Sequence, residues 1–176
     1  MFHCGNQADP VDSPQGEKSV HAFLLPTEGS PAFEAAIQQS IEVAKAIHAK
    51  VTGLHVIPEF HVFTYQTEML EDTREQFTKD SQSHAVRFLA VIQKAVEEAG
   101  VACDTAYMES DHPHEAIIKV AKERGFDLIA MASHGRKGIS GLLLGSETQK
   151  VLTHSKTPVL IFTQRWGQVK APAPAL

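Results

Sequence analysis

Five short apolar runs recur along the chain, separated by longer segments in which apolar and polar residues alternate with a helical period. Runs of strand length with few polar residues are typical of strands buried between layers of helices. Strands are predicted over residues 20–25, 50–57, 101–108, 127–131 and 157–162. Helices, with apolar residues three and four positions apart, are predicted over residues 31–49, 68–99, 113–124 and 146–153. This alternation predicts an α/β fold, a five-stranded parallel sheet with helices on both faces.

Prolines and capping residues set the predicted limits of several elements. Ser30 has the side chain of a helix N-cap, and Pro31 suits the first helical position. Pro26 is predicted to end the first strand before a turn over residues 27–30, and Gly100 suits a helix C-terminus.

The predicted helix over residues 68–99 is long for a small domain. At 1.5 Å per residue it would extend about 48 Å, so its first turns are predicted to fray or to form a separate segment. The preceding residues 58–67 are rich in aromatic side chains and are predicted to form an irregular loop over one end of the sheet.

Composition narrows the class of protein. The 176 residues are 43% apolar and 21% charged, which is ordinary for one globular domain. The net charge of −5 argues against nucleic acid or an anionic membrane as a partner, because both require a basic surface. No apolar run approaches the roughly 20 residues of a membrane span. A domain is predicted over residues 19–163, with flexible extensions over residues 1–18 and 164–176.

Cysteine usage points to a reducing compartment. Cys4 and Cys103 are the only cysteines, too few for a disulfide framework or a Cys-x-x-Cys site. Cys103 falls in an apolar run and is predicted to be a buried thiol. The N-terminal residues lack the pattern of a signal peptide, and a cytoplasmic protein is predicted.

The segment with the clearest chemical signature follows the fourth predicted strand. It reads Ala132-Ser133-His134-Gly135, then nine residues, then Gly145-Ser146. Glycines let a backbone approach a ligand closely, and a helix N-terminus offers N–H groups and a favourable dipole to an anion. The loop is therefore predicted to hold the phosphates of a nucleotide. The loop at residues 26–30 follows the first strand at the same edge of the sheet. It is the candidate for the second wall of the nucleotide site.

These residues resemble the phosphate motif of the universal stress protein family, in the subgroup that binds ATP. That motif is Gly, two residues, Gly, nine residues, then Gly-Ser or Gly-Thr. Gly135, Gly145 and Ser146 fit it, and Ala132 takes the place of the first glycine. The resemblance covers residues 20–162. Supporting matches are Pro26-Thr27 followed by an acidic residue, Leu54-His55-Val56-Ile57, His112-Pro113, and Lys-Thr-Pro-Val-Leu-Ile-Phe over residues 156–162.

The resemblance implies a strand order of 3-2-1-4-5, a flavodoxin-like arrangement. It implies ATP as ligand, with adenine against Val56 and a Mg²⁺ or Mn²⁺ ion or the ribose near Glu28. The residues it implies for nucleotide binding are Pro26, Thr27, Glu28, Val56, Met131, Ala132, Ser133, His134, Gly135, Arg136, Gly145, Ser146 and Glu147. It also implies a homodimer through the last strand, at Val159, Leu160, Ile161 and Phe162.

Several residues have simpler alternatives. Ser146 would cap a helix equally well, because Ser146-x-x-Gln149 has the spacing of a capping box. Arg136 either pairs with outer phosphates or is a solvated loop charge. His134 is interpreted as non-catalytic, since no serine, cysteine or carboxylate is tied to it by spacing. His55, on an apolar strand, is interpreted as a core histidine.

Two positions depart from the family pattern. Glu28 stands where aspartate is usual, and is otherwise a solvated turn residue. Ala132 adds a methyl where glycine is usual, which is tolerated if only a small side chain is needed. The leading hypothesis is a nucleotide-dependent regulatory module of the stress response, with at most slow ATP hydrolysis. A genuine ATPase or nucleotidyl transferase of the same fold, and a dimeric partner-binding scaffold with a degenerate nucleotide site, are the alternatives.

Overall fold

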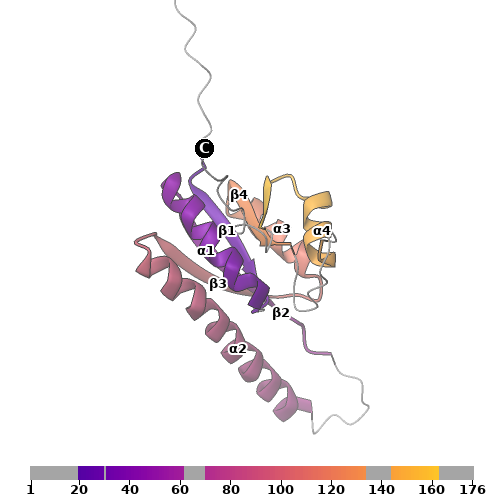
Figure 1. The fold of residues 1–176 in the computed structure, drawn as a ribbon. Helices are drawn as coiled ribbons and strands as arrows, with labels where there is room; N and C mark the ends of the chain where they lie inside the picture. Colours follow the sequence, from indigo (N-terminus) through magenta and orange to yellow (C-terminus); the bar gives the residue numbers. More distant parts are fainter. Residues whose placement is uncertain (1–19, 30, 62–69, 134–143, 163–176) are drawn as a thin grey trace, which may run out of the picture.

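The computed structural model describes residues 20–29, 31–61, 70–133 and 144–162 (Figure 1). In chain order its elements are β1 (Ala22–Thr27), α1 (Pro31–Ala46), β2 (Lys50–Ile57), α2 (Leu70–Glu98), β3 (Cys103–Glu109), α3 (Pro113–Glu123), β4 (Leu128–Ala132), α4 (Ser146–His154) and β5 (Val159–Phe162). The predicted alternation of strands and helices is confirmed.

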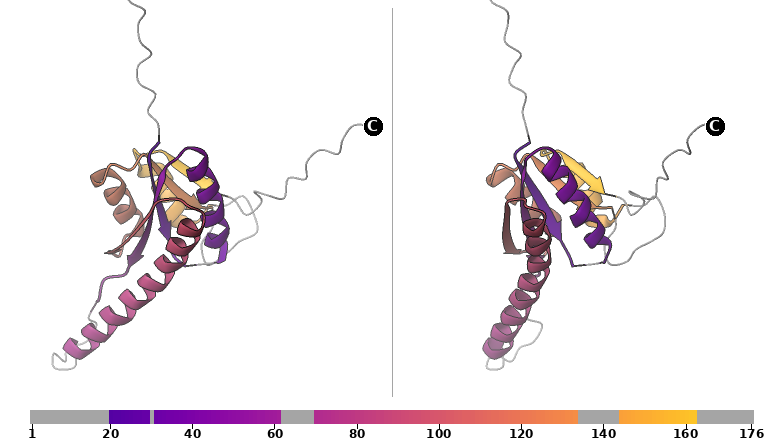
Figure 2. Two further views of the ribbon diagram at one scale, coloured as in Figure 1. Left: turned by 90° about the vertical axis from the view of Figure 1, so that its left-hand side faces the viewer. Right: turned by 60° about the vertical axis from the view of Figure 1, so that its left-hand side comes forward.

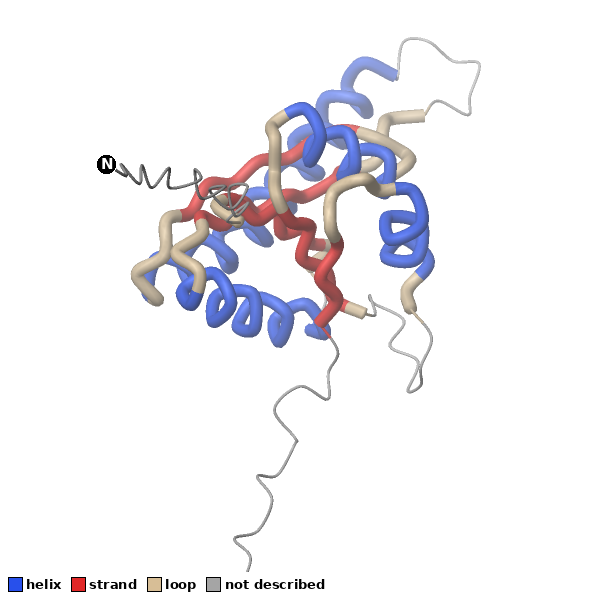
Figure 3. Tube along the Cα trace, turned by 90° about the horizontal axis from the view of Figure 1, so that it is seen from above, coloured by secondary structure: helices blue, strands red, loops and turns tan. Residues whose placement is uncertain are grey.

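Within these residues the five strands form one parallel sheet, in the order β3-β2-β1-β4-β5. Seen from above, the strands lie between helices (Figure 3). The α/β class and the strand order agree with the expectation. β1 is central: the chain crosses from it to β2 on one side and later returns to β4 on the other. The strand order therefore reverses between β1 and β4, the place where open parallel sheets bind ligands.

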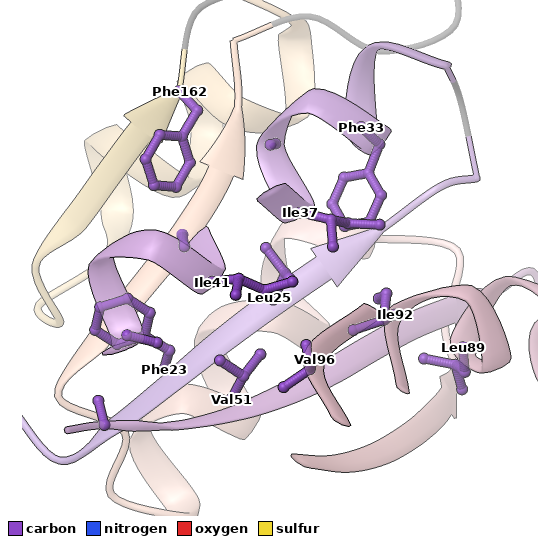
Figure 4. Packing of buried hydrophobic residues seen from close by; sticks show 14 residues of the cluster. Phe23, Leu25, Phe33, Ile37, Ile41, Val51, Leu89, Ile92, Val96 and Phe162 are labelled. Atoms are coloured by element: carbon purple, nitrogen blue, oxygen red, sulfur yellow. The ribbon is translucent and has the colours of Figure 1, made fainter. Parts of the chain in front are cut away.

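Helices cover both faces of the sheet. α1 and α2 pack on one face against Phe23 and Leu25 of β1, among others, and form the core shown in Figure 4. α3 and α4 cover the other face, where Ile117 and Val151 pack with Leu24. Successive strand side chains point to opposite faces, so Leu24 and Leu25 enter different cores. Burial of both faces explains why β1 and β4 read as nearly continuous apolar runs.

The long helix α2 extends well beyond the sheet (Figure 2). Its 29 residues correspond to about 44 Å. Its second half is anchored by the buried residues Ala85, Leu89, Ile92 and Val96. Gly53 of β2 permits this close packing, since a Cβ atom there would lie 3.0 Å from Ile92 Cδ1. The helix is continuous over Leu70–Glu98, so within the described residues its first turns do not form a separate segment.

The ends of β1 and α1 differ from the prediction. β1 continues through Pro26 to Thr27, whereas the sequence predicts that Pro26 ends it. α1 ends at Ala46 instead of residue 49. The cause is His48, whose φ of 54° is left-handed. The Ala49 N–H then donates to the Ala44 carbonyl at 2.9 Å, a Schellman-type helix end.

Cys103 opens β3 at the sheet edge and is half-buried, not fully buried as predicted. Partial burial raises the pKa of its thiol to about 11, and the neighbouring carboxylates of Glu97 and Asp104 act in the same direction. The thiol is therefore protonated at neutral pH.

Candidate functional site

The carboxyl ends of β1 and β4 form the centre of the candidate site. The two strands are paired at Phe23–Leu128 and Leu24–Ile129. β1 then runs on to Thr27 and β4 to Ala132, so both continue past their shared pairing. The strand order predicts a ligand-binding crevice beside these two strand ends.

Pro26 explains why the pairing between β1 and β4 stops. The Lys50 N–H donates to the His21 carbonyl, toward β2, and the Asp127 N–H donates to the Ala22 carbonyl, toward β4. Because backbone groups alternate in direction along a strand, those of Pro26 face β4. Proline has no N–H to donate. Its place in a central strand, which is otherwise unfavourable, is thus compatible with the end of the pairing on its β4 side.

A network of contacts fixes the turn after β1. Thr27 is buried and its carbonyl accepts a hydrogen bond of 2.8 Å from His55 Nδ1. The Thr27 hydroxyl accepts one of 3.0 Å from the Gly29 N–H. Gly29 has a φ of +71°, and a Cβ atom there would overlap the ring of Phe88 on α2. The prediction that His55 is a core histidine is confirmed, and the turn is held against α2.

The ends of the glycine loop are brought together at the carboxyl end of β4. The Ser133 N–H donates to the Phe162 carbonyl at 2.8 Å, and the Gly145 N–H donates to the Ser133 carbonyl at 2.7 Å. The Thr148 hydroxyl donates to the Ala132 carbonyl at 3.1 Å. These bonds seat the start of α4 directly on the end of β4. The predicted site residues His134, Gly135 and Arg136 lie outside the described residues.

Ala132 fits its position without strain. It is the last residue of β4 and pairs in register with Phe162. Among the described non-glycine residues, His48 is the one with a positive φ, so Ala132 has an ordinary backbone conformation that an alanine adopts without strain. Its methyl group packs on the core formed with α1 and α2.

The N-terminus of α4 faces the same edge of the sheet. Ser146 is its first residue and Gly145 occupies the N-cap, without a side-chain cap hydrogen bond. The capping-box interpretation of Ser146 is therefore wrong. It fails because the helix begins at Ser146, one residue earlier than that pattern requires. Since the first N–H groups of a helix lack intrahelical partners and a glycine cap offers no side chain, these groups are suited to an anion.

The Glu147 carboxylate is directed toward α3. Its Oε2 accepts hydrogen bonds from the His114 N–H at 3.0 Å and from His114 Nδ1 at 3.1 Å. Its Oε1 accepts one from Lys150 Nζ at 2.8 Å. Burial opposes ionisation, but the hydrogen bonds from Lys150 and His114 outweigh it and lower the pKa of Glu147. The group is an anion whose two oxygens are both engaged.

Of the other predicted site residues, two lie on the apolar face covered by α3 and α4, and Glu28 lies in an exposed turn. Met131 is buried on the face covered by α3 and α4, and Val56, one strand beyond β1, packs against the same core. Glu28 is exposed in the turn after β1. The structure thus brings together the ends of β1 and β4 and the start of α4, with Val56 at the periphery.

A group of possible metal ligands lies at a different part of the same sheet edge. Glu59 and His61 follow β2, Asp111 follows β3, and their ligand atoms lie within 4.8 Å of one another. The hydrogen bond from His61 lowers the pKa of the Asp111 carboxyl. All three residues are exposed. In the part of the chain that the structure describes, this is the one such group, and Glu28, the residue predicted to contact a metal, does not belong to it.

Three contributors to the site were not identified from the sequence. Thr148 bonds the end of β4, His114 holds Glu147, and Phe88 packs beneath Gly29. Their partners lie on other elements, and the His114–Glu147 contact joins residues 33 positions apart. A single sequence carries no local signal for such pairs.

The comparisons agree with this architecture. A model of the universal stress protein family matches residues 20–163. The chain therefore belongs to the universal stress protein family. Among curated relatives, YxiE of Bacillus subtilis is 32% identical over 143 residues, which are 79% of this chain and 96% of that protein.

Solved structures share the fold. The structure of MJ0577 from Methanocaldococcus jannaschii has a TM-score of 0.70 at 28% identity, covering 83% of this chain and 97% of that one. A universal stress protein solved in complex with cAMP has a TM-score of 0.60 at 22% identity. The match covers 82% of this chain and 98% of that one. In the described part of this chain, no helix combines the length and apolar character needed to cross a bilayer.

Proposed function

We propose that this chain is an ATP-binding regulatory module of the universal stress protein family, in which nucleotide occupancy is the signal. The observation that supports the proposal most directly is the seating of α4 on the end of β4. Its glycine-capped N-terminus faces the edge at which β1 and β4 run past their pairing. A helix N-terminus in this position is a phosphate site by the physics of its N–H groups and dipole.

The adenine and ribose would lie along the strand ends. Val56 and Met131 offer apolar surface on one face of the sheet, and Pro26 and Thr27 form the end of β1. The complex of a universal stress protein with cAMP supports an adenine nucleotide as the ligand class. Glu28, in the exposed turn after β1, is the residue that would contact the ribose or a Mg²⁺ or Mn²⁺ ion, since such ions prefer carboxylate oxygens.

The phosphates would lie at the N-terminus of α4, beside the end of β4. Among the described residues we assign Ala132, Ser133, Gly145 and Ser146 to them, since bonds join the end of β4 to the start of α4. We assign His134, Gly135 and Arg136 to the same ligand on their place in the motif. Glu147 would contribute its backbone N–H alone, because its carboxylate is bonded to His114 and Lys150 and would repel a phosphate. We assign the module at most slow hydrolysis, since the motif carries no residue pair for activating water.

The test is binding of ATP by the purified chain. A ligand that binds only the native state raises its melting temperature, so we expect a rise with ATP and Mg²⁺ and an adenine nucleotide in extracts of the protein. Ser146→Glu adds a negative charge at an exposed position beside the proposed phosphates. It should weaken ATP binding about tenfold or more, equivalent to roughly 1.4 kcal/mol.

Gln38→Glu is the matched control, because it adds the same charge at an exposed position of α1. It should leave ATP binding unchanged. Absence of both a bound nucleotide and a melting shift at millimolar ATP would contradict the proposal and favour the partner-binding scaffold. Rapid turnover of ATP would favour the enzyme.

The proposal extends to a homodimer in the cytoplasm. β5 is an edge strand of the sheet, and its residues Val159, Leu160 and Ile161 are half-buried apolar side chains. Edge strands with apolar side chains are ready surfaces for pairing with a second chain. A free Cys103 thiol is compatible with a reducing compartment.

A further inference from the structure

The position of Glu147 poses an electrostatic problem for a phosphate site. It is the second residue of α4, within the helix turn whose N–H groups are assigned to phosphates. A carboxylate near a helix N-terminus is attracted by the same partial positive charge that attracts a phosphate. If the Glu147 side chain turned back to its own helix, it would compete with the ligand for that charge and repel it.

The neighbouring helix removes this competition. His114, in the first turn of α3, donates two hydrogen bonds to Glu147 Oε2, from its backbone N–H at 3.0 Å and from Nδ1 at 3.1 Å. Lys150 Nζ bonds Oε1 at 2.8 Å. The side chain of His114 is 15% exposed and that of Glu147 is 36% exposed, so the pair is partly shielded from water. Such charge-assisted hydrogen bonds are stronger than neutral ones.

The hydrogen bond to Glu147 also defines which ring nitrogen of His114 carries a proton. A carboxylate only accepts, so Nδ1 of His114 carries the proton. Both the neutral and the protonated ring can donate from Nδ1. The other ionisable groups around the pair are Glu115 on α3, with Oε1 3.9 Å from His114 Nε2, and the rings of His112 and His154, each centred 6.3 Å from that of His114.

We propose that His114 is a positioning residue of the nucleotide site: it holds the Glu147 carboxylate on α3 and so leaves the first turn of α4 to the phosphates. This inference rests on the proposed function. It adds a specific consequence, namely that His114 discriminates by ligand charge. Its loss should weaken polyphosphate binding while leaving binding of the uncharged nucleoside intact, because only the phosphates meet the released carboxylate.

The test compares ATP and adenosine on the full-length chain by calorimetry. His114→Ala keeps the backbone N–H and removes only the ring donor. It should weaken ATP binding about three- to tenfold and change adenosine binding less than about twofold. The difference in ATP affinity between the variant and the wild-type protein should decrease at high salt, because screening reduces repulsion between partly exposed charges.

Glu147→Gln in the same background provides the decisive comparison. His114→Ala/Glu147→Gln should restore ATP affinity, because the amide carries no charge to repel phosphate. His112→Ala removes a neighbouring exposed ring that makes no cap hydrogen bond. It should leave ATP and adenosine binding unchanged. Equal loss of ATP and adenosine binding in His114→Ala, or failure of the second substitution to restore ATP binding, would overturn the inference. If the wild-type protein binds neither ligand, the proposed function itself fails.

Discussion

At Gly29, backbone conformation and packing both require a residue without a side chain. Its φ of +71° lies in the left-handed region, and the ring of Phe88 occupies the place of a side chain. The contact ties the turn after β1 to α2, far away in the sequence. Because this turn is one wall of the proposed nucleotide site, the fit between Gly29 and Phe88 sets the position of that wall.

Substitution of Gly29 should therefore cost more than backbone strain. We expect Gly29→Ala to lower the free energy of unfolding by about 2–4 kcal/mol, the sum of left-handed strain and overpacking. Gly125→Ala is the control, because Gly125 has a φ of +67° but nothing within 4 Å of an added Cβ. It should cost only about 1 kcal/mol. Urea unfolding measures the free energy of unfolding of both variants. Equal losses of stability would contradict the assigned clash with Phe88.

At the scale of elements, α2 has two halves with different surroundings. The second half is anchored by Ala85, Leu89, Ile92 and Val96, whereas the first half extends beyond the sheet (Figure 2). Helices of this kind owe most of their stability to the packing of an apolar face.

Hydrogen exchange should resolve this difference. Amides in residues 85–98 should be protected to nearly the global free energy of unfolding, and amides in residues 74–84 should exchange through local opening at a much lower free energy. Exchange measured by mass spectrometry on overlapping peptides gives both values. Uniform protection along the helix would show that a further surface covers its first half.

At the scale of the whole molecule, the two edges of the sheet differ. β3 and β5 are the edge strands. Tyr107 of β3 is 45% exposed, whereas Ile161 of β5 lies in an apolar, half-buried strand. The proposed dimer uses the β5 edge.

A charge on each edge tests this assignment. Light scattering after gel filtration should show a dimer for the wild-type chain. Ile161→Lys should shift it to a monomer, since a lysine on an edge strand opposes pairing. Tyr107→Lys, on the opposite edge, should remain dimeric. A monomeric wild-type chain, or dissociation caused by Tyr107→Lys alone, would exclude the β5 interface.

The sequence alone was sufficient for the class of fold and the approximate limits of most elements. Periodicity is a local property, because the backbone geometry of a strand or a helix sets its repeat of two or 3.6 residues. The loop motif could likewise be found without a structure, because a strand, glycines and a helix start follow one another along the chain. The resemblance carried by that motif then gave the strand order.

Only the tertiary structure decided how these parts meet. Pro26 lies inside a central strand, although proline usually ends one, because its backbone faces the side where β1 and β4 separate. Gly145 rather than Ser146 caps α4, since the helix start is fixed by bonds to the end of β4. Glu147 is paired with His114, 33 positions away. Such contacts depend on packing between distant elements, so they leave no periodic trace in the sequence.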